Sequence, residues 1–582
     1  MPTTGPVQPF AVVQSGNGQT QNNPQPIPVP PGPGWRADQI VAGFLAASTS
    51  FPHDHAAARA YLTPAARQKW TPGWAATVVA LAPKIKIAAP PRNLVPGGQL
   101  TATVKFTGQR LAALTSTGQY LTSSEPKEAD TFTLVKINGQ WRISRLPSPT
   151  SLILTKPDFQ RVYKPRNLYF FAPSGASLVP DPVFVPQQDN NAEPAKGLVE
   201  ALLKDPTGWL SGATRTGFPA GTKLLGEVKI LGNSAVVDLG GSAAKASPQV
   251  LSEMAAQLVW TLTSTSYSTP DIKSVVLEIN HQVQHPHGRQ YKVLSAYRGL
   301  LPASPVGGAY FLDSSGGIKL LPGRGQAARQ VAGPSGISQL PFTAIAVSPG
   351  GAQIAGIVPE HKGCLVYSGV LQRDATLTHR QLNSGTCTAL SWDNQGNIWA
   401  AAGAHVWMLP PGESAAVPVF LAGASALAGP SASLPSSDTI AALRVAPDGV
   451  RVVMIVRNKK GSADVLLGAI SRTGHGSEER TYIGQYGLLV AIGADVPDPS
   501  ALSWYDADHV LVLGQPHGAQ LYDVPLTGGA SVPIVTEPGT VSITAEGSVL
   551  VAGTSGGQIL VSSGSPPTWR PVSHGRAPAY PG

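Results

Sequence analysis

The stretch Ala344-Ile-Ala-Val-Ser-Pro-Gly-Gly351 recurs in altered form along the C-terminal half of the chain. Each copy is a short apolar strand pattern, then a polar turn, then a second apolar pattern such as Ile354-Ala-Gly-Ile-Val358. Strand–turn–strand units that return at a regular spacing indicate a repeat architecture. The other copies are Ala389-Leu-Ser-Trp-Asp-Asn-Gln-Gly396, Ala442-Leu-Arg-Val-Ala-Pro-Asp-Gly449, Ala501-Leu-Ser-Trp-Tyr-Asp-Ala-Asp508 and Val541-Ser-Ile-Thr-Ala-Glu-Gly547.

The spacing of these copies identifies the architecture. Their anchor residues are 45, 53, 59 and 39 positions apart, and are Val347, Trp392, Val445, Trp504 and Ile543. One four-stranded blade of a β-propeller takes about 40–50 residues, and inserted loops account for the longer gaps. The stretch 309–321 supplies part of a further blade. Residues 305–582 are therefore predicted to form a β-propeller of five or six blades.

The composition of the whole chain agrees with a multidomain protein rich in strands and turns. Its 582 residues are too many for one core, while 63 Gly and 55 Pro punctuate it and only 13% of the residues are charged. No apolar run is long enough to cross a membrane, and no signal peptide follows Met1. These features exclude a coiled coil, a long helical bundle and a disordered chain.

The net charge of +9 is unevenly distributed. Residues 1–304 carry 27 basic and 16 acidic side chains, whereas residues 305–582 carry 15 and 17. A basic front half favours anionic partners or a lipid surface, although a solvated basic surface explains the same excess. Nucleic acid is not an expected partner, because the chain has no RNP signature, recognition helix or basic and aromatic run.

Residues 1–34 contain no charged side chain and are dominated by Pro, Gly, Gln and Asn. Such a segment cannot bury enough apolar surface to fold, so it is predicted to be a disordered tether. Helical apolar spacing begins after Trp35, with Thr63-Pro64 as an N-cap and first-turn pair. Strand patterns follow from Ile85, and Asn138-Gly139 predicts a type I′ hairpin turn.

Two further domains are expected between the tether and the propeller. Residues 35–150 read as an α+β domain, whose closing hairpin Asn138-Gly-Gln-Trp-Arg-Ile143 resembles NTF2-like domains. Residues 166–300 resemble a GerMN domain, another α+β fold. The motifs that carry this second resemblance are Glu200-Ala-Leu-Leu-Lys-Asp-Pro-Thr207, Phe218-Pro-Ala-Gly-Thr-Lys-Leu-Leu-Gly226 and Ser234-Ala-Val-Val-Asp-Leu239.

The order of these parts resembles the LpqB family of actinobacterial lipoproteins. The resemblance implies an extracytoplasmic protein that is anchored to the cell membrane through a lipidated N-terminal cysteine. This sequence has no such cysteine, so Met1 is expected to replace a signal peptide and the anchor residue. The resemblance also implies a non-enzymatic accessory role for the MtrA–MtrB two-component system in cell-envelope homeostasis and division, with an MtrB-like sensor histidine kinase as partner.

Few residues suggest chemistry. His281, His285 and His287 form the best metal candidate, because three imidazoles could bind zinc, but a strand end running into a polar turn explains them equally. Gly553-Thr-Ser-Gly-Gly557 matches the Gly-x-Ser-x-Gly pattern of hydrolases. It lies between two strand patterns, however, where a hairpin turn is expected instead of a nucleophile elbow. We therefore predict no catalytic residues and no cofactor.

Cys364 and Cys387 are the only cysteines. They lie on neighbouring elements of adjacent repeats, so a disulfide is predicted for an oxidising compartment. Two buried thiols remain the alternative.

The sequence thus predicts a membrane-tethered interaction protein. The alternatives are an envelope protein that binds peptidoglycan or a small ligand, or an enzyme that uses the propeller channel, because propellers support many functions. Converging charged side chains at the channel mouth would favour a ligand-binding or catalytic channel, and a funnel of small residues would favour a scaffold.

Overall fold

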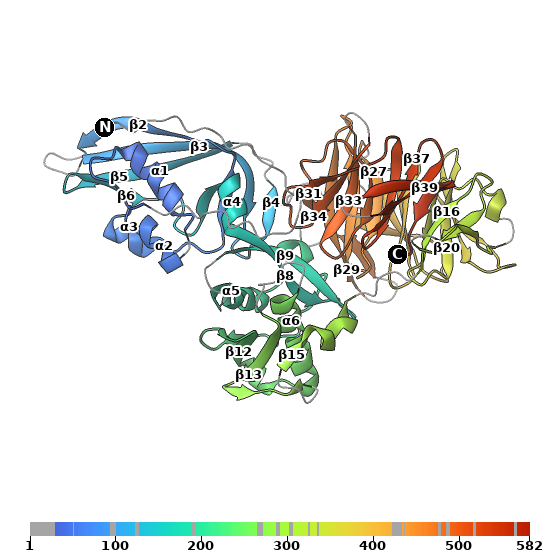
Figure 1. Ribbon diagram of the computed structural model, residues 1–582, viewed down its shortest axis with the longest axis horizontal. Helices are drawn as coiled ribbons and strands as arrows, with labels where there is room; N and C mark the ends of the chain where they lie inside the picture. Colours follow the sequence, from blue (N-terminus) through green and yellow to red (C-terminus); the bar gives the residue numbers. More distant parts are fainter. Residues whose placement is uncertain are drawn as a thin grey trace.

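The chain folds into an N-terminal α+β domain, a second α+β domain and a C-terminal propeller, which meet around one long hairpin (Figure 1). The computed structural model describes residues 29–582 except 51, 94–99, 123–126, 188–191, 265–271, 287–290, 302–306, 324–325, 335–336, 422–433, 436, 475–478, 485–488, 516–518 and 564–566. Most of the predicted tether, residues 1–28, lies outside the described residues. Its last part is in contact with the folded body, because the Tyr61 hydroxyl donates a hydrogen bond of 2.7 Å to the Val29 carbonyl.

The N-terminal domain packs short helices against a curved sheet. Apolar residues of α1 (Ala37–Ala47) face the buried side of the sheet, and the Thr63 side chain caps α3 (Pro64–Lys69) as predicted. Asn138 and Gly139 have φ angles of 48° and 77°, which confirms the type I′ turn. The sheet has the order β6 (Gln140–Arg145), β5 (Lys127–Ile137), β3 (Leu100–Leu114), β1 (Ala76–Val79) and β7 (Leu152–Thr155), with β2 (Lys84–Asn93) and β4 (Tyr120–Thr122) also paired to β3.

The second domain places two helices against a small mixed sheet. The helix α6 (Pro248–Thr263) is the central element, and nearly every residue of its last three turns is buried. The helix α5 (Ala192–Leu202) packs beside it in the same core. The sheet is ordered β10 (Thr222–Leu224), β12 (Ser234–Gly241), β13 (Ser274–Ile279) and β14 (Gln282–Val283), with β11 (Lys229–Leu231) paired to β12 and β15 (Tyr291–Val293) paired to β13.

A two-stranded hairpin, β8 (Tyr163–Phe171) and β9 (Leu178–Pro186), connects all three domains. Phe184 packs into the core of the N-terminal domain, Val183 into that of the second domain, and Val179 into a core shared with the propeller. Every residue of β9 is buried. The hairpin therefore acts as a common spine, and the sequence analysis did not identify β9.

The prolines of β9 explain how such a strand can be buried. The Phe184 amide points away from β8 and donates to the carbonyl of Gly118. Every second residue of a strand has this orientation, and the residues of β9 that alternate with Phe184 in this way are Pro180, Pro182 and Pro186. A proline at these positions has no N–H group, so it leaves no unpaired donor on the outer edge of the strand. The same pattern hides the strand from sequence reading, because proline normally argues against a strand.

The C-terminal domain is a propeller with six blades in the described residues, in agreement with the prediction of five or six. Two of the blades join into one larger sheet, because β26 pairs in parallel with β30. The blades are β40–β16–β17–β18 (Arg576–Ala579, Ala309–Leu312, Ile318–Leu321, Arg329–Gln330), β19–β22 (Ala344–Val347, Gln353–Glu360, Gly363–Val370, Thr378–Leu382), β23–β26 (Cys387–Trp392, Ile398–Ala402, His405–Leu409, Val417–Leu421), β27–β28–β29–β31 (Thr439–Val445, Arg451–Arg457, Ala463–Thr473, Val490–Ile492), β32–β35 (Pro499–Trp504, His509–Gly514, Gln520–Pro525, Val532–Ile534) and β36–β39 (Thr540–Glu546, Val549–Thr554, Gln558–Ser563, Thr568–His574). The strand β30 (Arg480–Ile483) pairs with the end of β29 and links this blade to β26.

The first blade is closed by the last strand of the chain. β40 pairs with β16, so residues 576–579 complete the blade of which the sequence showed only 309–321. This closure leaves no open edge between the first and last blades. Between β21 and β23, Cys364 and Cys387 form a disulfide with their Cα atoms 5.9 Å apart, which joins two adjacent blades.

Candidate binding site at the propeller channel

A cavity of about 290 Å³ opens at one mouth of the propeller channel. Inner strands of all six described blades contribute to its wall. Leu178 and Pro180 of β9 also line it, as does Leu301, which lies between the second domain and the propeller. We call this space the channel-mouth cavity. Because β9 covers part of it, its shape depends on how the second domain sits on the propeller.

Equivalent positions on the inner strands form a ring, and all of its members except Ser391 line the cavity. The Ser391 hydroxyl accepts a hydrogen bond of 2.9 Å from the Val445 amide on the next blade. The Ser503 hydroxyl accepts one of 3.1 Å from the Ala545 amide, and the Thr544 hydroxyl accepts one of 3.0 Å from the Tyr580 amide. This repeated bond defines the ring, whose members are Ala346, Ser391, Arg444, Ser503, Thr544 and Ala579.

The ring corrects one detail of the repeat alignment. Ala545, not Ile543, takes the place that Val445 and Trp504 hold on their blades, because it donates to the preceding blade in the same way. The strand register agrees, since Ala545 pairs with Leu550 as Trp504 pairs with Val510. The predicted anchor Ile543 is wrong by two residues. The short turn between Glu546 and Val549 removed the spacing cue.

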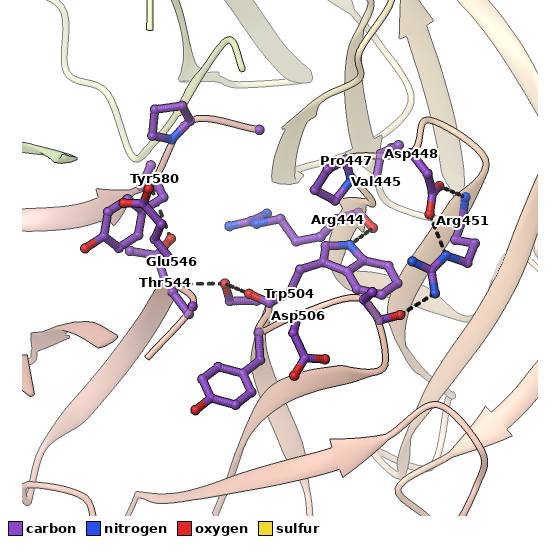
Figure 2. Close-up of a pocket in the computed structure, with 18 of the residues that line it drawn as sticks. Arg444, Val445, Pro447, Asp448, Arg451, Trp504, Asp506, Thr544, Glu546 and Tyr580 are labelled. Atoms are coloured by element: carbon purple, nitrogen blue, oxygen red, sulfur yellow. Dashed lines mark hydrogen bonds and ion pairs between the residues drawn. The ribbon is translucent and has the colours of Figure 1, made fainter. Parts of the chain in front are cut away.

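Arg444 is the exception in the ring. The other five members are Ala, Ser or Thr, whereas Arg444 extends across the cavity toward the side that carries Tyr580 and Glu546 (Figure 2). Its Nη1 donates to the carbonyls of Leu390 and Leu443 at 2.9 and 2.8 Å. Burial lowers the pKa of its guanidinium to about 10. The residue is only partly exposed, so the surrounding protein removes much of the water around the guanidinium.

The other cation at the cavity wall, Arg451, has partners. The Arg451 Nε lies 2.6 Å from Asp448 Oδ2, and its Nη1 donates to the carbonyl of Ala507 at 2.6 Å. Its guanidinium also lies 5.1 Å from the centre of the Trp504 ring. Both Arg451 and Asp448 are almost fully buried. This pair closes the wall and holds the turn after β27, so it is structural.

Two carboxylates of the wall differ in their surroundings. Burial raises the pKa of Asp506, but the hydrogen bond and charge of His509 outweigh this effect and leave the pKa below its usual value. His509 Nδ1 lies 3.1 Å from Asp506 Oδ1. For Glu546, burial alone raises the pKa. Its carboxylate forms no ion pair with the described residues, and it faces the same space as Arg444 (Figure 2).

A buried polar cluster lies where the second domain meets the propeller. Asp181 of β9 is fully buried, and it accepts hydrogen bonds from the Thr207 amide at 2.7 Å, the Thr207 hydroxyl at 2.6 Å and the Trp209 indole at 3.2 Å. Burial raises the pKa of Asp181 to about 6. Nearby, the Asn167 amide nitrogen donates to Asp508 of the propeller at 2.6 Å.

The predicted histidine site is only partly described. His281 is 80% exposed, and its Nδ1 lies 2.5 Å from Oδ2 of Asp238, a carboxylate supplied by β12. His285 follows β14, and His287 lies outside the described residues. Within the described part of the chain, no group of three or more His, Cys, Asp or Glu side chains could hold a metal ion. The Gly553–Gly557 motif forms the turn between β37 and β38, as expected of a hairpin.

Comparison with known proteins agrees with the three domains. Residues 30–160 match the model of the lipoprotein LpqB N-terminal domain, residues 167–284 the sporulation and spore germination model, and residues 319–581 the lipoprotein LpqB β-propeller model. Lipoprotein LpqB of Thermobifida fusca is 32% identical, and the match covers 100% of this chain and 96% of the relative. The chain belongs to the LpqB lipoprotein family.

Other members of the LpqB family are more distant. The Streptomyces coelicolor lipoprotein LpqB is 29% identical over 93% of this chain and 89% of the relative, and the Mycobacterium tuberculosis one is 25% identical over 83% and 79%. Among solved structures, the first GerMN domain of GerM from Bacillus subtilis is 21% identical, covering 22% of this chain and 98% of that chain with a TM-score of 0.19. TolB from Acinetobacter baumannii is 15% identical, covering 53% and 83% with a TM-score of 0.34.

Family membership makes this chain an extracytoplasmic lipoprotein. None of the helices in the described ranges is long and apolar enough to span a bilayer.

Sequence reasoning missed both Arg444 and Asp181. A signal for Arg444 was present in the repeats, because Ala442-Leu-Arg-Val has a long cation where Ala389-Leu-Ser-Trp and Ala501-Leu-Ser-Trp have serine. A signal for Asp181 was its isolation in the apolar run 178–186. The signal for Arg444 could be interpreted only once the ring of equivalent strand positions was known. The signal for Asp181 could be interpreted only once β9 was known to be a strand.

Proposed function

We propose that this chain is a lipid-anchored, non-enzymatic accessory protein of a sensor histidine kinase. In the MtrA–MtrB system that its family suggests, it would bind the extracytoplasmic domain of an MtrB-like kinase and contribute to cell-envelope homeostasis and division. The observation that carries this proposal is a row of exposed lysines on the N-terminal domain, at the basic end of the chain.

The lysine row lies on the outer face of the sheet. Lys86 of β2 stands directly opposite Lys105 of β3, and Lys84 lies two residues along the same face of β2. All three side chains are exposed and have no ion pair with the described residues. Like charges opposite each other on neighbouring strands are destabilising. An acidic partner surface would offset this repulsion.

Anchoring in one membrane makes modest affinity sufficient. Two proteins that share a membrane plane meet at an effective concentration of roughly millimolar when their linkers are short. Surface charges then contribute to the encounter rate and to specificity more than to raw affinity. The docking should weaken as salt rises past about 0.15 M, where the Debye length is about 8 Å.

The test uses the full chain, because removal of the propeller would expose apolar residues such as Val179, Trp209 and Leu210 that share its core. The triple variant Lys84→Glu, Lys86→Glu, Lys105→Glu should bind the purified extracytoplasmic domain of the kinase at least about tenfold more weakly. The matched control reverses three exposed lysines of the propeller, Lys362, Lys459 and Lys460, and should bind like the wild type.

Two results would contradict the docking proposal. Equal loss in both triple variants would show that only the total charge matters, and no change in either would place the contact elsewhere. Peptidoglycan binding by the second domain is the main alternative. Retention of the full chain on purified cell wall, with no binding to the kinase domain, would favour it.

A further inference from the structure

A second candidate ligand site is the channel-mouth cavity, where Arg444 is the one charged member of the ring described above. At five of the six described ring positions the side chain is a small Ala, Ser or Thr, and at the three Ser or Thr positions the hydroxyl accepts a hydrogen bond from an amide of the next blade. Arg444 replaces that pattern with a long charged side chain. Local departures from an otherwise consistent pattern are expected at functional or strained positions.

Arg444 is held in place but not neutralised. Only its Nη1 is used by the protein, for the carbonyls of Leu390 and Leu443, and its Nε and Nη2 make no hydrogen bond with the described residues. No carboxylate of the described residues forms an ion pair with it. A charge removed from water without a counterion costs free energy, so an anion in the cavity would find a preorganised partner.

The rest of the wall defines what kind of anion fits. Trp504, Pro447 and Tyr580 present apolar and aromatic surface to the same space, while the Trp504 indole is held by a 3.2 Å hydrogen bond to the Arg444 carbonyl. Glu546 lies across the cavity from Arg444 (Figure 2). Its carboxyl group would repel a second negative charge and accept a hydrogen bond from a ligand donor.

We propose that the channel-mouth cavity binds a small organic monocarboxylate, with its anionic group on Arg444 and its apolar part against Trp504, Pro447 and Tyr580. The volume of about 290 Å³ is at the lower end of ligand pockets and suits a molecule of metabolite size. The ligand would also touch Leu178 and Pro180 of β9, so its binding would depend on the packing of the second domain. This site is independent of the lysine row and of kinase docking.

The experiment follows the fluorine NMR signal of 4-fluorophenylacetate in the presence of the full chain. The wild type should bind this probe with a low-millimolar or tighter dissociation constant. The neutral isostere 4-fluorophenylacetamide should bind roughly tenfold to a hundredfold more weakly, the range expected for loss of one charge-assisted hydrogen bond. Inorganic phosphate should not displace the probe, because it lacks the apolar part and carries more than one charge.

Variants separate a binding role from a structural one. Arg444→Ser installs the residue that blades β23–β26 and β32–β35 have at this position, and it should weaken the probe at least tenfold while the melting temperature stays the same or rises. Arg444→Lys keeps the charge and should retain binding within about tenfold. Arg570→Ser removes an exposed arginine of β39 and is the matched control, with unchanged binding.

Three results would overturn the proposal. They are a wild type that does not bind the probe, equal binding of the acid and the amide, and an Arg444→Ser variant that binds normally. A lower melting temperature together with normal binding would show that Arg444 serves only the two carbonyls. If Arg444→Ser does not fold, the comparison of acid and amide on the wild type still decides the question.

Discussion

Where the hairpin β8–β9 and the second domain meet the propeller, both sides contribute to one apolar core. Val179, Trp209 and Leu210 pack with propeller residues, and the buried side chains of Asn167 and Asp181 form hydrogen bonds across or beside the junction. Where the N-terminal domain meets the propeller, β4 only approaches β31 (Val490–Ile492), and the Thr122 hydroxyl lies 3.5 Å from the Ala491 carbonyl. A cavity of about 340 Å³ separates the two surfaces beside this contact.

The difference indicates two kinds of coupling. A shared apolar core behaves as one folding unit, because its disruption exposes apolar surface on both sides. A short contact beside a cavity offers little free energy, so the N-terminal domain is held mainly through its packing on the hairpin and not by its direct contact with the propeller. The second domain and the propeller should therefore unfold together, whereas the N-terminal domain should move about its end of the hairpin.

The largest effect should come from Asp181→Ala. The substitution leaves the Thr207 amide, the Thr207 hydroxyl and the Trp209 indole without their acceptor in a fully buried position. We expect a loss of roughly 3–5 kcal/mol in urea unfolding of the full chain, because each buried unsatisfied donor costs about 1–3 kcal/mol. The exposed Asp205 provides the control, and Asp205→Ala should stay within about 0.5 kcal/mol of the wild type. Equal effects of the two would mean that the junction is not a shared core.

The ionisation of Asp181 should also make the stability of this junction depend on pH. The pKa of Asp181 is about 6 in the folded protein, above the ordinary aspartate value of 3.8, so the unfolded state loses its proton first as pH rises. The stability contributed by the protonated form is complete below about pH 4 and is lost as pH rises through 6. Two pKa units correspond to about 3 kcal/mol.

Asp181→Asn removes this titration. Thermal unfolding of the wild type and of Asp181→Asn between pH 4 and 7 should show the wild type losing stability relative to the variant as pH rises. A difference that stays constant over this range would show that the carboxyl group is not desolvated in the folded state.

An element of the fold could be predicted where neighbouring residues carry a recognisable sequence pattern. The propeller was predicted from five similar strand–turn–strand units, and the type I′ turn was predicted from Asn138-Gly139. Both are recognisable because repeats and hairpin turns have signatures in residues that are close together in the sequence. The spine β9 could not be found, because Pro180, Pro182 and Pro186 contradict a strand unless their outward edge is known. The closing strand β40 was hidden for a related reason, since Arg576-Ala-Pro-Ala579 gains its partner from β16, more than 260 positions earlier.

The channel-mouth cavity depended on the same kind of long-range information. Arg444 is an ordinary strand residue until Ser391, Ser503 and Thr544 are known to occupy equivalent places on other blades. Apolar periodicity places residues on a face, but it does not reveal which six strands converge on one axis. The chemistry of the channel was therefore visible only in three dimensions.

The smallest effect should come from the N-terminal contact. Thr122→Val removes a hydrogen bond whose 3.5 Å length is at the limit of a useful interaction. We expect a change below about 0.5 kcal/mol in the free energy of urea unfolding, far less than for Asp181→Ala.

Hydrogen exchange in the native state should show the same order of stability for the two junctions. The backbone amides of β31 that face β4 should exchange faster than the Val183 amide of β9, which is buried in the spine. Protection of β31 equal to that of β9 would mean that the N-terminal domain is fixed to the propeller. The lysine row would then have one orientation relative to the channel-mouth cavity, and docking at one site could be transmitted directly to the other.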